Sequence, residues 1–373
     1  MNLTVLGVTQ MLLSVLLVAA LPLAIVWTSD DTNKYRKLAL VTLFLTFDLV
    51  VFGGFTRLTD SGLGCPDWPG CYGHANPLQA GSEIQLAQSA MPTGPVSQTK
   101  AWIEMIHRYL GMTVGVLIVA MTCSAWYRWQ KSQRQIAQFA PHAPTALLAL
   151  VLLQGAFGAW TVTLKLQPVI VTTHLLLGLS LLAALTWTYA RLAPTSGDSA
   201  DARALRGPAL LALILLAVQI ALGGWVSTNY ATLACSDFPM CQGNWLPAMD
   251  FGNGFTLWRS LGKTSGGDFL PFAALTAIHW VHRNFALVVI ACTAYVGVRA
   301  LKLDELRRTG RWLLIVLFAQ FLTGLSTIYF QFPLLLAVLH NAGAALLVVL
   351  LVMLNYRTRH ASQPGSAAAA SQR

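Results

Sequence analysis

The chain has 373 residues, of which 55% are hydrophobic and only 10% are charged. A soluble domain carries about 25% charged residues, so this composition excludes an ordinary soluble protein and indicates an integral membrane protein. The net charge of +10 would suit a nucleic-acid-binding protein, but the basic residues collect in short segments between apolar runs, as membrane topology requires, and we expect no nucleic acid as a partner.

Nine apolar runs are long enough to cross a bilayer as helices, since about 20 residues suffice. They cover residues 3–27, 38–56, 102–127, 144–164, 168–190, 208–227, 271–298, 311–329 and 333–356. Runs of this length exclude a transmembrane β-barrel, whose strands are shorter and alternate between apolar and polar residues. The sequence therefore predicts an all-α integral membrane protein.

The loops between these runs differ in charge from one to the next. Alternate loops and the tail hold 17 Lys and Arg residues, whereas the other loops hold only five. The positive-inside rule places the basic set in the cytoplasm, so the long loops 57–101 and 228–270 face the outside, as does the N-terminus. The first run lacks a basic segment before it, which favours an extra membrane helix over a signal peptide.

The chain repeats itself after the first run. Gly53-Gly54 recurs as Gly223-Gly224, and the pattern Cys-x-Asp-x-Pro-x-Cys-x-Gly of residues 65–73 recurs at 235–243, in each case 170 positions later. The repeating unit is four helices, and an even number of crossings gives both copies the same orientation. The sequence therefore predicts two four-helix transmembrane bundles related by a parallel internal repeat, plus one extra N-terminal helix.

This repeat divides the chain into segments. We expect an N-terminal helical segment (1–37), a first four-helix half (38–191), a cytoplasmic linker (192–207), a second four-helix half (208–357) and a disordered tail (358–373).

Each half carries one His on its second helix and one on its fourth, namely His107 with His174 and His282 with His340. Each lies about five to seven residues after the predicted start of a helix that runs inward, so the members of a pair lie at matching depth. Two imidazoles facing each other across a bundle favour a haem iron bound from both sides. Hydrogen bonding between helices, or a zinc site with further ligands, are the alternatives.

Charged residues accompany these histidines. Arg108 and Arg283 each follow a His directly, and in a haem site we expect them to pair with propionates, with snorkelling to the interface as the alternative. Glu104 in the first half corresponds to His279 in the second. A carboxyl group shielded from water can donate or accept a proton near neutrality, so we expect the first half to be the reactive site.

The long loops hold two cysteine pairs, Cys65 with Cys71 and Cys235 with Cys241. In an oxidising compartment each pair is expected to form a disulfide within its loop. A staple for the loop is the favoured role, and a redox role or zinc ligation is the alternative.

These residues together resemble the haem A synthase family. The resemblance rests on Gly-Gly-Phe-Thr-Arg-Leu-Thr-Asp-Ser-Gly-Leu-Gly-Cys-Pro-Asp-Trp-Pro-Gly-Cys at 53–71, on Glu-Met-Ile-His-Arg at 104–108, and on His174, His282-Arg283 and His340. It covers residues 38–357, and the helix before them is additional to the eight-helix core of the family. Cysteine pairs in both outer loops resemble the bacterial members.

The resemblance implies that the protein oxidises the C8 methyl group of haem O to a formyl group, through two hydroxylations and loss of water. His107 and His174, with Arg108, would bind the substrate haem. His282 and His340 would be the axial ligands of a haem b cofactor. Glu104 would be the catalytic residue that moves protons. Oxygen activation at iron needs an open position, so either one His leaves the substrate iron during turnover or the mechanism differs from simple haem monooxygenation.

The resemblance also implies the setting of the reaction. The enzyme would lie in a bacterial inner membrane, with its haem sites toward the periplasm, and would use molecular oxygen or water as the oxygen source with an unidentified electron donor. Haem O synthase, oxidase assembly factors and a second copy of the chain are candidate partners. The competing hypotheses are a di-haem b-type cytochrome that exchanges electrons with quinone, which would not need Glu104, and a transporter, which would bind no pigment.

Overall fold

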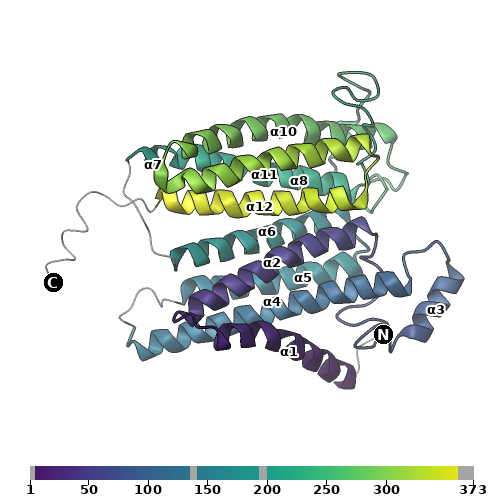
Figure 1. The fold of residues 1–373 in the computed structure, drawn as a ribbon. Helices are drawn as coiled ribbons and strands as arrows, with labels where there is room; N and C mark the ends of the chain where they lie inside the picture. The colour runs from purple at the N-terminus through teal and green to yellow at the C-terminus, as the bar shows by residue number, and fades with distance from the viewer. Residues whose placement is uncertain (1–4, 135–140, 193–199, 360–373) are drawn as a thin grey trace.

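The computed structural model describes residues 5–134, 141–192 and 200–359. In this part of the chain nine helices are long and apolar enough to cross a membrane, which confirms the predicted number and the all-α class (Figure 1). They are α1 (Val5–Thr28), α2 (Lys34–Leu58), α4 (Gln98–Lys131), α5 (His142–Thr163), α6 (Pro168–Arg191), α8 (Arg206–Thr228), α10 (Phe272–Leu301), α11 (Asp304–Tyr329) and α12 (Leu334–Arg359).

Some helices extend beyond the apolar runs because their polar ends suit helix termini. α4 begins at Gln98 rather than 102, since the Ser97 side chain accepts a hydrogen bond from the backbone N–H of Lys100 and caps the helix. α11 begins at Asp304 rather than 311, with two acidic residues in its first turn, where they face the positive end of the helix dipole.

Three short helices were not predicted, because they are too short or too polar to cross a membrane: α3 (Gly81–Ala90), α7 (Ala200–Ala204) and α9 (Phe251–Gly254). α7 shows that the predicted linker 192–207 is partly helical, and α8 already begins within it. The predicted tail is also too long by two residues, since Thr358 and Arg359 belong to α12. Residues 193–199 of the linker and 360–373 of the tail lie outside the described part.

The helices pack in two sets. In the first set α2 and α5 each contact both α4 and α6, and in the second set α8 and α11 each contact both α10 and α12. α1 packs outside the first set, against α4 and α2. The sets meet where α12 contacts α2 and α6, and where α6 contacts α8. Figure 1 shows the second set, in teal, green and yellow, as a layer beside the first.

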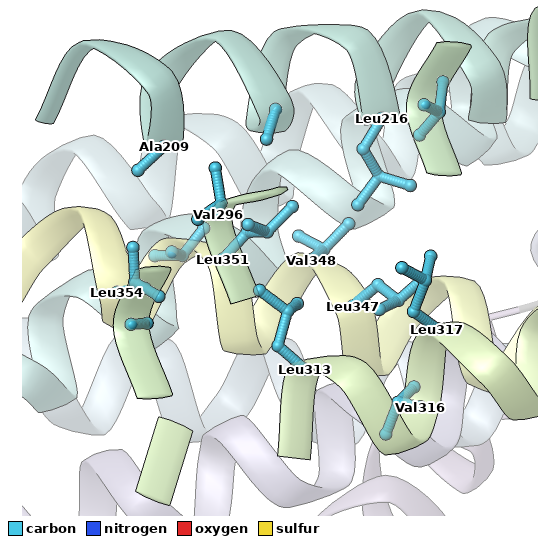
Figure 2. Close-up of a cluster of buried hydrophobic side chains, with 14 of the residues drawn as sticks. Ala209, Leu216, Val296, Leu313, Val316, Leu317, Leu347, Val348, Leu351 and Leu354 are labelled. Atoms are coloured by element: carbon cyan, nitrogen blue, oxygen red, sulfur yellow. The ribbon is translucent and has the colours of Figure 1, made fainter. Parts of the chain in front are cut away.

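Apolar side chains fill the interior of both sets at the ends remote from the long loops. In the second set Leu216 of α8, Leu313 of α11 and Leu351 of α12 belong to one buried cluster, which is shown in Figure 2. A separate buried cluster around Leu117 and Met121 of α4 fills the first set. Buried polar side chains at these ends, such as Thr122 and Asn355, hydrogen-bond to backbone carbonyls of the helices, as burial of a polar group requires.

The helix halves nearer the long loops carry polar contacts between the two sets. Nη2 of Arg57 donates to the Ser227 carbonyl at 2.5 Å, and the Tyr230 hydroxyl donates to Oδ1 of Asp60 at 2.7 Å. Each contact joins two positions that are 170 residues apart, the offset of the sequence repeat. Matching positions therefore meet at the boundary between the sets.

Candidate functional site

In the first set each membrane histidine lies against a glycine of a neighbouring helix. A Cβ atom built on Gly53 of α2 would lie 2.9 Å from Cε1 of His107 on α4. A Cβ atom on Gly158 of α5 would lie 3.3 Å from Cε1 of His174 on α6. The imidazoles thus occupy space that only glycine leaves open.

The second set repeats this arrangement. A Cβ atom on Gly223 of α8 would lie 2.9 Å from Cε1 of His282 on α10, and one on Gly324 of α11 would lie 3.0 Å from Cε1 of His340 on α12. Each set therefore brings two imidazoles from opposite helices into one interior, each beside a glycine.

The depth of the histidines agrees with the prediction for His174 and His340 and differs from it for His107 and His282. His174 and His340 lie six residues after the first residues of their helices, Pro168 and Leu334. His107 lies nine residues after Gln98, because α4 begins earlier than predicted. His282 lies ten residues after Phe272, and the predicted start at 271 already lay 11 residues before it, so the predicted depth was wrong for this residue.

Glutamine amides contact three of the four rings. Nε2 of Gln154 lies 3.4 Å from Nε2 of His174, and the equivalent pair, Gln320 and His340, is 3.2 Å apart. Gln219 contacts Nδ1 of His282 at 3.1 Å. A neutral imidazole ring is suited to bind a metal. At His174 and His340 the glutamine contacts Nε2, so a metal bound through that atom would replace this contact.

Glu104 is almost fully buried on α4, with 4% of its surface exposed. Its Oε1 accepts a hydrogen bond from Nη2 of Arg108 at 2.6 Å, and its Oε2 accepts one from the backbone N–H of Cys65 at 2.8 Å. The carboxylate therefore joins the helix that carries His107 to the first long loop.

His279 stands at the corresponding place in the second set and is 6% exposed. Its Nδ1 accepts a hydrogen bond from the backbone N–H of Cys235 at 3.3 Å. The same backbone donor of the repeated loop is thus satisfied in both halves, by a carboxylate in one and by an imidazole in the other.

The two arginines bind the loops rather than lying free at the surface. Arg108 donates through Nη1 to the carbonyls of Asp67, Pro69 and Gly70. Arg283 donates to carbonyls at the matching loop positions, those of Asp237, Pro239 and Met240. The pairing of either guanidinium with a propionate stays a prediction.

Each loop turns around a disulfide and an aspartate. Cys65 is bonded to Cys71, and Cys235 to Cys241; all four side chains are at most 2% exposed. Asp67 accepts the backbone N–H groups of residues 72 and 73, and Asp237 those of 242 and 243. Burial shields both sulfur pairs from an external thiol, which fits a staple for the loop.

Sequence reasoning missed the two glycines that face His174 and His340. Gly158 and Gly324 were not singled out, although they lie 166 positions apart like His174 and His340.

Among the described residues no group of three or more His, Cys, Asp or Glu side chains could hold a metal ion. Zinc held by side chains alone therefore has no ligand cluster there.

The chain is similar to known proteins over most of its length. Residues 36–352 match the family model COX15-CtaA, described as cytochrome oxidase assembly protein. A heme A synthase of Shewanella oneidensis is 37% identical over 328 residues, which are 87% of this chain and 97% of the relative. Heme A synthases of Novosphingobium aromaticivorans and a Caulobacter species are each 31% identical, over 86% and 89% of this chain and 94% and 98% of theirs.

Proposed function

Because the chain belongs to the haem A synthase family of cytochrome oxidase assembly proteins, we propose that it is a haem A synthase. It is an oxidoreductase that converts the C8 methyl group of haem O to a formyl group and so makes haem A for terminal oxidases. The observation that carries this proposal is the pair of imidazoles beside glycines in each set, combined with the buried carboxylate of Glu104 at the position where the second set has His279.

We assign the substrate to the first set, with His107 and His174 as ligands of the haem O iron. Gly53 and Gly158 leave room for the two rings. Two neutral imidazoles from opposite helices provide the donor set that a haem iron takes. Glu104 lies one helical turn before His107, and we assign it the transfer of protons during oxidation of the methyl group.

We assign a haem b cofactor to the second set, with His282 and His340 as its axial ligands. The residues fit this group, since Gly223 and Gly324 again face the rings. When bound, haem b supplies one-electron transfer. The residues of this set hold the cofactor, orient its ligands and exclude water, and His279 replaces the acid.

The architecture we propose is a duplicated four-helix bundle, with residues 38–191 and 208–357 as the two halves and an additional helix in front. Three observations support it: the matching helix contacts within each set, the glycine–histidine pairs at repeat-related positions, and the contacts 170 residues apart where the sets meet. We propose that the long loops and both sites face the periplasm of a bacterial inner membrane, and the distribution of Lys and Arg supports this orientation.

Analysis of the bound pigments tests the function. Protein is purified from cells that make haem O and from cells that do not, and the haems are extracted and identified by mass. Haem b in both preparations, with haem O or haem A only in the first, is the expected result. Haem b alone in both would favour an electron-transferring cytochrome, and the absence of any haem would favour a transporter. The electron donor and the oxygen source need separate assays.

A further inference from the structure

The rings of the two sets differ in what holds their Nδ1 atoms. In the second set Nε2 of Gln219 lies 3.1 Å from Nδ1 of His282 and also donates to the backbone carbonyl of His282 at 3.1 Å. The hydroxyl of Thr323 lies 3.1 Å from Nδ1 of His340. Both axial candidates of the second set therefore have a polar partner on the ring nitrogen away from Nε2.

In the first set these partners are replaced by apolar side chains. The residue 170 positions before Gln219 is Leu49, and the residue 166 positions before Thr323 is Phe157. Neither side chain can form a hydrogen bond. Among the described residues, Nδ1 of His107 and Nδ1 of His174 are buried and have no hydrogen-bond partner.

This difference matters for a histidine that binds metal through Nε2. Such a ring carries its proton on Nδ1, and a partner that accepts this proton fixes the orientation of the ring and makes Nε2 a stronger ligand. The Thr323 hydroxyl can accept it directly. Oε1 of Gln219 has no partner of its own. A half-turn of the amide would bring that oxygen to Nδ1, with loss of the hydrogen bond from Nε2 to the His282 carbonyl.

Two other kinds of contact do not separate the two sets. Gln154 and Gln320 contact the Nε2 atoms of His174 and His340 in the same way, and a glycine faces each of the four rings. The Nδ1 partners are therefore one feature of the ring environment that distinguishes the sets. Another is Phe52, which stacks on His107 with ring centroids 6.3 Å apart, where the second set has Leu222.

We propose that Gln219 and Thr323 are positioning residues that make the second site retain its haem, and that Leu49 and Phe157 leave the imidazoles of the first site releasable. This inference rests on the proposed function. It explains how one chain keeps a cofactor haem permanently and exchanges haem O for haem A in a similar pocket. It also allows one imidazole of the first site to leave the iron during turnover.

The test measures how fast haem leaves the second site of the full-length protein. Purified protein is mixed with excess apomyoglobin, and transfer of haem b is followed by absorbance. Loss of a hydrogen bond to a metal-bound histidine weakens binding about 10- to 100-fold. We expect Gln219→Leu combined with Thr323→Val to release haem b faster by about this factor. Gln219→Glu retains an acceptor oxygen and is expected to release it slowly, as the unaltered protein does.

A matched control and a spectrum separate positioning from general damage. Thr327, one turn after Thr323, donates to the carbonyl of Gly324 and not to a ring, so Thr327→Val is expected to leave the release rate unchanged. The low-spin electron paramagnetic resonance signal of the second haem is expected to shift in Gln219→Leu and Thr323→Val, because the ligand strength of the imidazole changes, and to stay constant in Thr327→Val.

The reciprocal variant tests the first site. Leu49→Gln supplies the missing partner to His107, and we expect haem O to leave this site about tenfold more slowly. Unchanged release from both Gln219→Leu/Thr323→Val and Leu49→Gln, in proteins that load haem normally, would overturn the inference alone. An unaltered protein that carries no haem at either site would overturn the proposed function instead.

Discussion

The two halves hold their outer loops through the same contacts but use different residues at one of them. Arg108 and Arg283 bind loop carbonyls at matching positions, and both halves satisfy the N–H of the first loop cysteine from the same place on a helix. In the second half the imidazole of His279 accepts that hydrogen bond. Anchoring the loop therefore does not require a carboxylate, and the carboxylate of Glu104 is available for chemistry in the first half.

The same difference changes the charge beside each site. Glu104 forms an ion pair with Arg108 at 2.6 Å, whereas within the described residues Arg283 has no ion pair shorter than 4.0 Å. The first site thus holds a compensated pair, and the second holds a guanidinium that donates to three carbonyl groups and lies over the Phe238 ring, 5.2 Å from its centroid. Of the two arginines, we therefore expect Arg283 to be the one that attracts a propionate.

Removing a ligand gives the largest effect we expect. In His282→Ala the second site loses one of its two imidazoles, and we expect the b-type signal to disappear from the reduced-minus-oxidised spectrum while haem O still binds at the first site. His74→Ala, which alters a loop histidine paired with Glu83, is the control and is expected to retain both. Unaltered haem content in His282→Ala would show that the halves are misassigned.

Exchanging Glu104 and His279 tests directly whether the difference between the two halves matters for activity. Glu104→His places in the first half the residue that anchors the second loop, so we expect the loop to stay in place and the b-type spectrum to be unchanged. The proton-transferring group is lost, and haem A formation is expected to fall at least about 100-fold. Haem A output is measured by extraction and mass analysis. Output near that of the unaltered protein would mean that the carboxylate serves only as an anchor.

The reverse exchange is the matched control for that experiment. His279→Glu creates in the second half the carboxylate–arginine pair of the first, and we expect haem b to remain bound and haem A to be made. Loss of the b-type spectrum in this variant would indicate that the position supports the cofactor itself.

Much of this comparison could be predicted from the sequence. Nine membrane helices follow from apolar length, and the four histidines and the difference between Glu104 and His279 follow from aligning the chain with itself. What escaped prediction depends on distances between side chains. The partners of Arg108 and Arg283 are backbone carbonyls of a folded loop, which carry no signal in the residue types. Leu49 and Phe157 become informative only once their helices face the rings.

Substituting the glycines beside the rings is expected to have a smaller effect, on stability, and it tests whether the two sites hold their rings alike. Gly53→Ala and Gly223→Ala each place a methyl group 2.9 Å from an imidazole carbon, and overpacking of this kind costs about 1–3 kcal/mol. We expect the cost to be larger at Gly223, because Gln219 restrains His282, whereas His107 can shift. Thermal unfolding in detergent measures both variants.

Gly115 supplies the control for this pair of substitutions. It lies in α4, and a Cβ atom there would have no neighbour within 4 Å. Gly115→Ala is therefore expected to leave stability unchanged or to raise it by up to about 1 kcal/mol through helix propensity. Equal costs at Gly53 and Gly223 would argue that the two rings are held alike.

The smallest effect we expect concerns the second outer loop at low pH. The backbone N–H of Gly243 donates to the Asp237 carboxylate and, with that of Gln242, lowers the pKa of Asp237 below its ordinary value of 3.8. A carboxylate whose pKa is lower in the folded protein stabilises the fold above its unfolded pKa, and this contribution is lost as the pH falls through the folded value. We expect the amides of residues 242 and 243 to lose protection from hydrogen exchange only below about pH 4. Asp237→Asn cannot titrate, so it should show reduced protection that does not change between pH 3 and 6, after correction for intrinsic exchange rates. Protection in the unaltered protein that persists undiminished well below the folded pKa would mean that the Cys235–Cys241 bond holds this turn without the carboxylate.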